Sequence, residues 1–275
     1  MNPLFYENVK ILDRIEKEKF TAEILEFKSL KGANDLDLAG EIFFARETGM
    51  SLKQVKITLR NGSFMTEAGA LYFMKGRISA QTNVGGVGGL MKKAFKSYLN
   101  QESTFKPTYE GTGEIFLEPT FGHYVFFELD NESVIVDKGL FYACEPSLQV
   151  EPAMQGNLSS GLFGGEGWFQ TKISGTGLCI LEIPVPREEV LIYELNNEKL
   201  QVDGNFALLR TEGINFSVQK SSKTLVGTLA SGEGLLQTFE GTGQVWLAPT
   251  QPVYKKLETY GVQALNKSKN ISNDV

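Results

Sequence analysis

Apolar and polar residues alternate along much of the chain, in short runs separated by turn-forming residues. Val55, Ile57 and Leu59 are separated by polar residues, and residues 214–218 alternate in the same way. A period of two is typical of a strand with one buried face and one solvated face. Glycine, at 29 residues, gathers in the polar stretches between these runs. The pattern therefore predicts an all-β protein with many tight turns.

A short motif recurs three times along the chain. Gly-Thr-Gly occupies residues 111–113, 175–177 and 241–243, and its first glycines lie 64 and 66 residues apart. Each copy leads into an apolar run that a proline ends, so we expect a turn or bulge that opens a strand. Regular self-similarity of this kind indicates internal duplication.

The repeat alignment also predicts burial. Ile115, Cys179 and Val245 occupy the same position after the motif, so all three are expected to point into a core. The two cysteines, Cys144 and Cys179, lie in apolar runs and are expected to be free, buried thiols.

A unit of about 65 residues buries little of its surface alone, so the units are expected to share a core. We predict three tandem β-sandwich-like repeats around a pseudo-threefold axis. A short helix is expected in the N-terminal extension, with Ile11, Leu12 and Ile15 on one side. The expected organisation is an N-terminal extension 1–50, repeats 51–120, 121–185 and 186–252, and a C-terminal segment 253–275 that ends in a disordered tail.

The first repeat carries an insertion. Glycines within 85–89 precede residues 90–99, where apolar side chains recur at helical spacing and lysines take the other side. Such a helix either caps its own sandwich, which we favour, or docks on a membrane surface or a protein partner. The residues of this expected interaction helix are Met91, Lys92, Phe95, Lys96 and Tyr98.

Charge and hydropathy narrow the function classes. The net charge of −6 argues against nucleic acid as a main partner, because phosphate binding needs a basic face. No stretch reaches the ~20 apolar residues of a membrane span, and the N-terminus lacks the apolar core of a secretory signal. We expect a cytoplasmic protein, either free or peripheral to the inner face of the membrane.

Few residues suggest chemistry. Glu102, Glu166 and Glu233 precede the three motifs and would suit Ca²⁺ or Mg²⁺ if they converged, but the favoured interpretation is hydrogen bonding within their own turns. The lone histidine, His123, is interpreted as structural, since it leaves no basis for a histidine metal cluster. The glycine runs lack the Gly-Lys-Ser/Thr of a phosphate loop. We expect no cofactor.

The run from Leu59 to Gly76, the Gly-Gly-x-Gly-Gly run of 85–89 and the paired Gly-Glu-Gly and Gly-Thr-Gly turns together resemble one family. It is the family of the altered inheritance of mitochondria protein number twenty-four, and the resemblance covers roughly 51–250. It implies a threefold duplicated β-sandwich like that of the tryptophan RNA-binding attenuation protein, without implying binding of tryptophan or RNA. Mitochondrial relatives are linked to inner-membrane organisation. The first copy departs from the family's acidic turn at 101–103, which weakens the idea of three equivalent sites.

The leading hypothesis is a non-enzymatic binding or scaffold protein acting near a membrane. The alternative is a small-molecule or metal-binding protein with a pocket between repeats. An enzyme ranks third because no catalytic constellation is recognisable. The partner is expected to be a membrane surface or a protein, and a homo-oligomer remains open.

Overall fold

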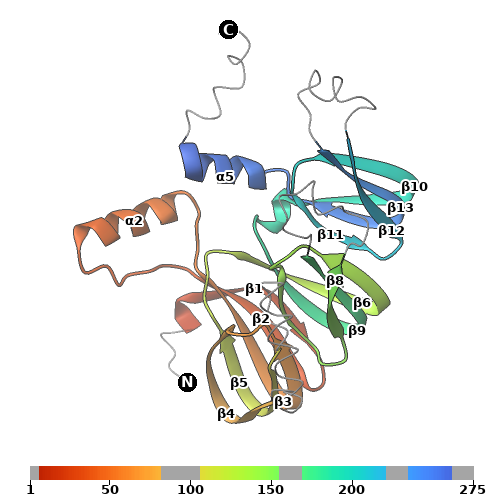
Figure 1. The fold of residues 1–275 in the computed structure, drawn as a ribbon. Helices are drawn as coiled ribbons and strands as arrows, with labels where there is room; N and C mark the ends of the chain where they lie inside the picture. Colours follow the sequence, from red (N-terminus) through yellow and green to blue (C-terminus); the bar gives the residue numbers. More distant parts are fainter. Residues whose placement is uncertain (1–5, 82–105, 155–168, 221–234, 262–275) are drawn as a thin grey trace, which may run out of the picture. The chain divides into compact units, whose positions relative to one another are not determined.

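The computed structural model describes residues 6–81, 106–154, 169–220 and 235–261. Antiparallel strands make up most of them, which confirms the expected β-rich fold (Figure 1). The strands are β1 Val9–Glu16, β2 Phe20–Phe27, β3 Lys53–Thr66, β4 Leu71–Gln81, β5 Thr108–Leu117, β6 His123–Val136, β7 Phe141–Cys144, β8 Gln149–Met154, β9 Phe169–Ile183, β10 Leu191–Asp203, β11 Ala207–Thr211, β12 Ile214–Lys220 and β13 Leu235–Leu247. The helices are α2 Leu36–Glu47, α5 Gln251–Tyr260 and the short 3-10 turn η1 Arg187–Glu189.

The chain divides into two compact units. Unit 1 comprises residues 1–128, 141–148 and 177–182, and unit 2 comprises 129–140, 149–176 and 183–275. Strands β6 and β9 each contribute residues to both units. This division does not confirm the expected arrangement of three repeats about a pseudo-threefold axis.

The sheet of unit 1 is built around β3. On one side β3 pairs with β2, which pairs in turn with β1. On the other side β3 pairs with β5 along most of its length, and β5 pairs with β4. The end of β3 pairs with β7 on the side opposite β5, since Met65 lies between Thr108 of β5 and Cys144 of β7. Residues 9–27, expected to lie in an extension, are thus part of this sheet.

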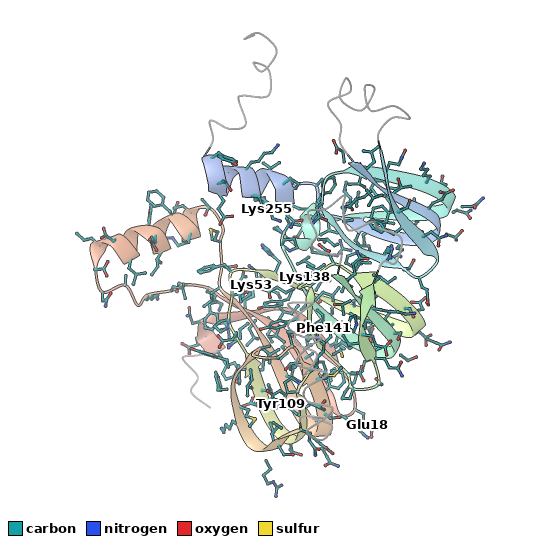
Figure 2. The ribbon with its side chains drawn as sticks, in the orientation of Figure 1. Glu18, Lys53, Tyr109, Lys138, Phe141 and Lys255 are labelled. Carbon is teal, nitrogen blue, oxygen red and sulfur yellow. The ribbon has the colours of Figure 1, made fainter. Side chains whose placement is uncertain are left out.

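Alternating residues of these strands form the core of unit 1. Ile24 pairs with Val55, and Ile57 pairs with Ile115, so these apolar side chains stack on one face of the sheet. All four side chains are buried. Phe20 and Phe64 also meet edge to face there, with 5.1 Å between ring centroids. Figure 2 labels Tyr109 and Phe141, two further buried residues of this unit.

The helix expected around Ile11 to Ile15 is wrong, because these residues belong to β1. The pairing of β1 with β2 shifts register between Ile11 and Asp13. The alternation of apolar and polar residues is interrupted at this irregularity, where the apolar Ile11 and Leu12 follow each other. That irregularity imitates helical spacing in the sequence. Ile11 and Leu12 are both exposed, so neither provides the buried stripe that a helix would need.

Unit 2 is organised by β13. Strand β10 pairs with β13 along its full length on one side, while β11 and β12 share the other side. Strand β11 also pairs with the end of β6. The core of this unit contains Leu195, Val202, Ile214, Phe239, Val245 and Leu247.

The three Gly-Thr-Gly motifs lie inside β5, β9 and β13 and not in the loops between strands. Each central threonine accepts a hydrogen bond at its hydroxyl from the backbone N–H of an asparagine. Each of these asparagines has a positive φ, at 49°, 54° and 55°. The pairs are Asn61 with Thr112 at 2.9 Å, Asn131 with Thr176 at 2.9 Å and Asn197 with Thr242 at 3.1 Å.

The glycines are required where the strands approach closely. The Cβ of any other residue at Gly113 would lie 2.2 Å from the carbonyl oxygen of Lys75. The expectation that the motif opens a strand is wrong, because it lies within one. Register shifts occur in the partner strands instead, between Arg60 and Gly62 in β3 and between Asn196 and Glu198 in β10. We call the hydrogen bond from the asparagine N–H to the threonine hydroxyl the Asn–Thr latch.

The predicted burial is confirmed. Ile115, Cys179 and Val245 are each fully buried. Cys144 and Cys179 are both free and lie opposite each other on β7 and β9. Burial raises the pKa of both thiols, so neither has the thiolate character of a reactive cysteine.

The C-terminal segment begins with an unexpected element. Helix α5 starts after Thr250 and carries Pro252 in its first turn, where a proline costs no hydrogen bond. It ends at Gly261, whose φ of 67° suits glycine. Neither α5 nor any other helix in the described part of the chain has the length and apolar character needed to cross a membrane.

Candidate functional site

The main candidate site of unit 1 is the segment that joins β2 to β3. It contains α2, whose first turn is capped by the Asp35 carboxylate, which accepts a hydrogen bond of 2.8 Å from the Leu38 N–H. At the other end the Thr48 hydroxyl donates to the Phe44 carbonyl oxygen at 2.8 Å. Local capping thus stabilises a helix that has no buried residue.

The side chains of this helix are apolar yet exposed. Leu36 is 90% exposed and Phe44 is 68% exposed, and Leu38, Phe43 and the nearby Met50 are exposed as well. Phe43 and Phe44 pack edge to face, with ring centroids 5.5 Å apart. A cluster of large apolar side chains of this kind is typical of an interaction surface.

Apolar residues are distributed all round α2. Residues two positions apart project about 200° apart on a helix, so Ile42 and Phe44 point to nearly opposite sides. Accordingly the helix has no distinct polar and apolar faces. A helix with apolar residues on several sides is normally buried on more than one of them. Among the described residues nothing provides that burial.

A groove of about 1100 Å³ lies beside this helix. We call it the α2 groove. Its apolar lining includes Leu30, Ile42, Leu52 and Phe121, and its charged lining includes Glu26, Lys28, Lys31, Glu41 and Arg46. The groove and the exposed helix form one continuous surface, because α2 supplies much of the lining.

The charges of α2 itself are mostly acidic. Arg46 pairs with Glu47 at 3.0 Å and also lies over the Phe43 ring, 5.6 Å from its centroid. Asp37 and Glu41 form no ion pair with any described residue. The helix therefore presents two uncompensated carboxylates among its apolar side chains.

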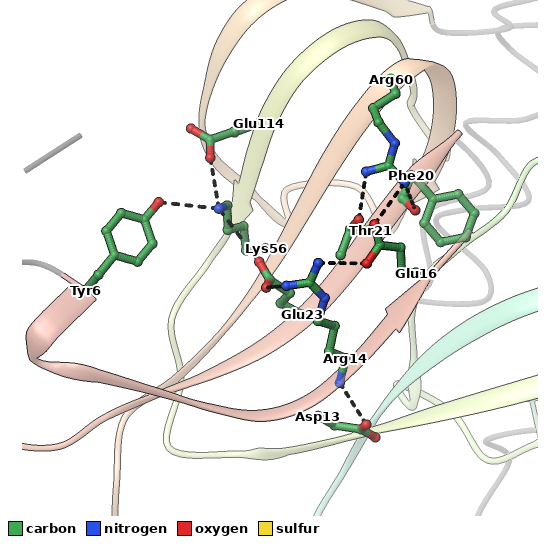
Figure 3. A network of polar contacts seen from close by, with 10 residues as sticks. All are labelled: Tyr6, Asp13, Arg14, Glu16, Phe20, Thr21, Glu23, Lys56, Arg60 and Glu114. Carbon is green, nitrogen blue, oxygen red and sulfur yellow. Dashed lines mark hydrogen bonds and ion pairs between the residues drawn. The ribbon is translucent and has the colours of Figure 1, made fainter. Parts of the chain in front are cut away.

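A second polar cluster, centred on Lys56, lies on the sheet of unit 1 (Figure 3). The Lys56 ammonium lies 2.8 Å from Glu114 and 3.7 Å from Glu23, and it donates to the Tyr6 hydroxyl at 3.3 Å. Burial lowers the pKa of Lys56, but the hydrogen bonds to Glu114 and Tyr6 outweigh it and raise the pKa above its ordinary value. Glu114, Glu23 and Tyr6 together satisfy the Lys56 ammonium, so we interpret this cluster as structural.

Most of the expected site residues lie outside the described residues. This applies to Glu102, Glu166 and Glu233 and to the expected helix 90–99 with its residues Met91, Lys92, Phe95, Lys96 and Tyr98. His123 begins β6 and is half-buried. Within the described ranges no group of three His, Cys, Asp or Glu side chains could hold a metal ion.

Sequence reasoning missed α2. Its signals are present: Asp35 provides a cap, twelve residues follow without proline, and Gly49 ends the helix with a φ of 76°. The periodicity is absent because apolar residues lie on all sides, so no stripe identified the segment as helical.

The fold is similar to that of a solved structure. A crystal structure from Streptococcus pyogenes, solved by a structural genomics consortium, aligns at a TM-score of 0.55 and 20% identity, covering 77% of this chain and 94% of that chain. At this identity the likeness shows the fold alone. No curated protein matches the sequence. The profile of the family described as mitochondrial biogenesis AIM24 matches residues 45–250, and the chain therefore belongs to that family.

Proposed function

We propose that this protein is a non-enzymatic binding or scaffold protein that holds a protein partner through α2 and the α2 groove. The observation that carries the proposal is the exposure of large apolar side chains on every side of a well-capped helix. Exposed apolar surface is costly in water, and burying it is worth roughly 25 cal/mol per Å². A partner that covers Leu36, Phe43 and Phe44 would recover that free energy.

The distribution of apolar residues favours a protein over a membrane surface. A helix that lies in a bilayer interface needs one apolar face and one strongly polar face. Helix α2 lacks this division. Its free carboxylates, Asp37 and Glu41, would also be repelled by anionic lipids. A protein groove can enclose the helix from several sides, and the same carboxylates favour a partner with a basic rim.

The test begins with a photo-crosslinking amino acid at position 44, incorporated in the native host. A discrete cross-linked protein is then purified and titrated against this chain by calorimetry. We expect Phe44→Asp to weaken that binding by about tenfold or more, as for a central anchor residue. Thermal stability should stay unchanged, because Phe44 is largely exposed.

Tyr260→Asp is the matched control, since Tyr260 is an exposed aromatic residue at the end of α5. Binding should survive this change. Equal binding by the Phe44→Asp and wild-type proteins would contradict the proposal. Flotation with phosphatidylglycerol vesicles that is lost in Phe44→Asp would replace the protein partner by a membrane surface.

The volume of the α2 groove supports a second candidate, an apolar small molecule. At about 1100 Å³ the groove exceeds most drug-sized sites. A ligand bound at Ile42 and Phe121 would raise the melting temperature, and replacing either residue by a charged one would remove that shift. A full protein partner is preferred because the outward side of α2 would stay exposed around a small ligand.

We further propose that the protein arose from three copies of one unit, with boundaries near 51–120, 121–185 and 186–252. The recurrence of the Asn–Thr latch at near-equal spacing supports this proposal. Three sandwich-like copies would be expected to relate by a pseudo-threefold axis.

A further inference from the structure

Two long strands have one open edge each. Strand β4 pairs with β5 alone, and β10 pairs with β13 alone, among the strands that the structure describes (Figure 1). They are 11 and 13 residues long. An outer strand of this length presents backbone N–H and C=O groups that can pair with another strand.

Both strands also expose apolar side chains. Tyr72, Phe73 and Met74 are exposed on β4, and Leu191 and Tyr193 are exposed on β10. Phe73 stacks on Phe116 with 4.4 Å between ring centroids, which holds it in place on the surface of the sheet. Aromatic and aliphatic residues on neighbouring strands stabilise pairing by roughly 0.2–1 kcal/mol per pair.

The two edges carry opposite charge. Strand β4 contains Lys75 and Arg77 and no acidic residue. Strand β10 contains Glu194, Glu198 and Asp203 against a single lysine. Like charges disfavour pairing of either strand with its own copy, whereas opposite charges favour pairing of one with the other.

Lys75 and Arg77 have no carboxylate partner among the described residues. Lys75 lies opposite Glu114 in the β4–β5 register, but the Glu114 carboxylate contacts Lys56 at 2.8 Å. Both cationic side chains are exposed. They are therefore available to an acidic strand.

Strand β1, which also pairs with a single described strand, shows the contrasting case. Arg14 pairs with Glu16 at 2.8 Å and with Glu23 at 3.2 Å, and Lys10 pairs with Glu26 at 3.7 Å. Its charges are thus compensated within unit 1, and the strand carries no net attraction for either sign.

We propose that this chain associates with a second copy of itself by pairing β4 of one molecule with β10 of the next. The contact is head-to-tail, so a pair of molecules leaves one β4 and one β10 unpaired, and further molecules extend the assembly to a closed ring or an open filament. This contact uses no residue of α2. An assembly of this kind would display several copies of α2 and raise its avidity for a partner.

Charge reversal with sedimentation velocity tests the pairing. Lys75→Glu with Arg77→Glu should weaken self-association by about tenfold or more, and so should Glu194→Lys with Glu198→Lys. Mixing these two double variants should restore association, because each acidic edge again meets a basic edge. Association of the wild type should also weaken at high ionic strength, where the screening length falls to about 3 Å.

Lys255→Glu with Lys256→Glu on α5 is the matched control and should leave association unchanged. Circular dichroism checks that each variant is folded, as expected for exposed positions. A wild type that stays monomeric across the concentration range would overturn the proposal. Association that persists in both double variants, or that does not return on mixing, would overturn it as well.

Discussion

Arg210 in β11 is a buried charged residue of unit 2 whose guanidinium is incompletely hydrogen-bonded. Its side chain is 3% exposed, and its Nε and Nη1 atoms have no hydrogen-bond partner in the described structure. The guanidinium lies 5.5 Å from the centroid of the Phe216 ring. Burial lowers the pKa of Arg210 to about 10, below the value of the unfolded chain. The protonated form therefore destabilises the folded state at all pH values below about 10, and this cost falls as the pH rises above that value.

Arg210→Met should stabilise the protein at neutral pH. Methionine keeps an apolar contact with Phe216 and removes a buried, unpaired charge, a change worth about 1–3 kcal/mol. Arg187→Met is the control, because Arg187 also lies over an aromatic ring, that of Trp246, but is exposed. Thermal unfolding at neutral pH should show a gain for the first variant alone. A loss of stability in Arg210→Met would mean that the guanidinium is paired in solution.

If the three Asn–Thr latches are equivalent, removing any one of them should lower the free energy of unfolding by the same amount. Thr112→Val, Thr176→Val and Thr242→Val each remove the hydroxyl that accepts an asparagine N–H. Each should cost about 1 kcal/mol in denaturant unfolding, since each leaves one donor without its partner. Thr108→Val in β5 is the control without such a bond. Costs that differ by several-fold among the three latches would contradict their equivalence.

At the scale of elements, α2 is stabilised by its caps and not by packing. Gly40 lies inside the helix, and a Cβ added there would meet nothing within 4 Å. Gly40→Ala should therefore slow amide exchange in residues 36–47 by about two- to fivefold, through helix propensity alone. Gly49→Ala should have the opposite effect, because Gly49 has a φ of 76°. Equal exchange in the two variants would argue against this account of the helix.

The elements differ in how far their sequence predicts them. Strands such as β3 and β12 follow from alternation, and the burial of Ile115, Cys179 and Val245 follows from the repeat. The sequence around Ile11 predicts a helix where β1 forms, because the register shift after Ile11 disturbs the alternation. The sequence of α2 does not predict a helix by periodicity, because its apolar residues form no stripe. In both cases periodicity, the main local signal, does not indicate the element that forms.

At the scale of the molecule, sequence reasoning found the family and the β-rich class but not the division into two units. Contacts between residues distant in sequence determine that division, and strands β6 and β9 each serve both units. The residues singled out for cations and for the 90–99 helix lie outside the described ranges, so those expectations stay predictions. The candidate surface on α2 is identified by the exposure of its apolar side chains, which the sequence alone does not give.

The central claim is that α2 is covered by a protein partner in the cell. Oxidative footprinting of Phe44 and Met50, in intact cells and in the purified protein, tests it directly. Tyr260, 72% exposed on α5, serves as the internal reference. We predict that oxidation of Phe44 and Met50 relative to Tyr260 falls several-fold in cells, because the partner excludes solvent from α2. An equal ratio in cells and in the purified protein would contradict the claim.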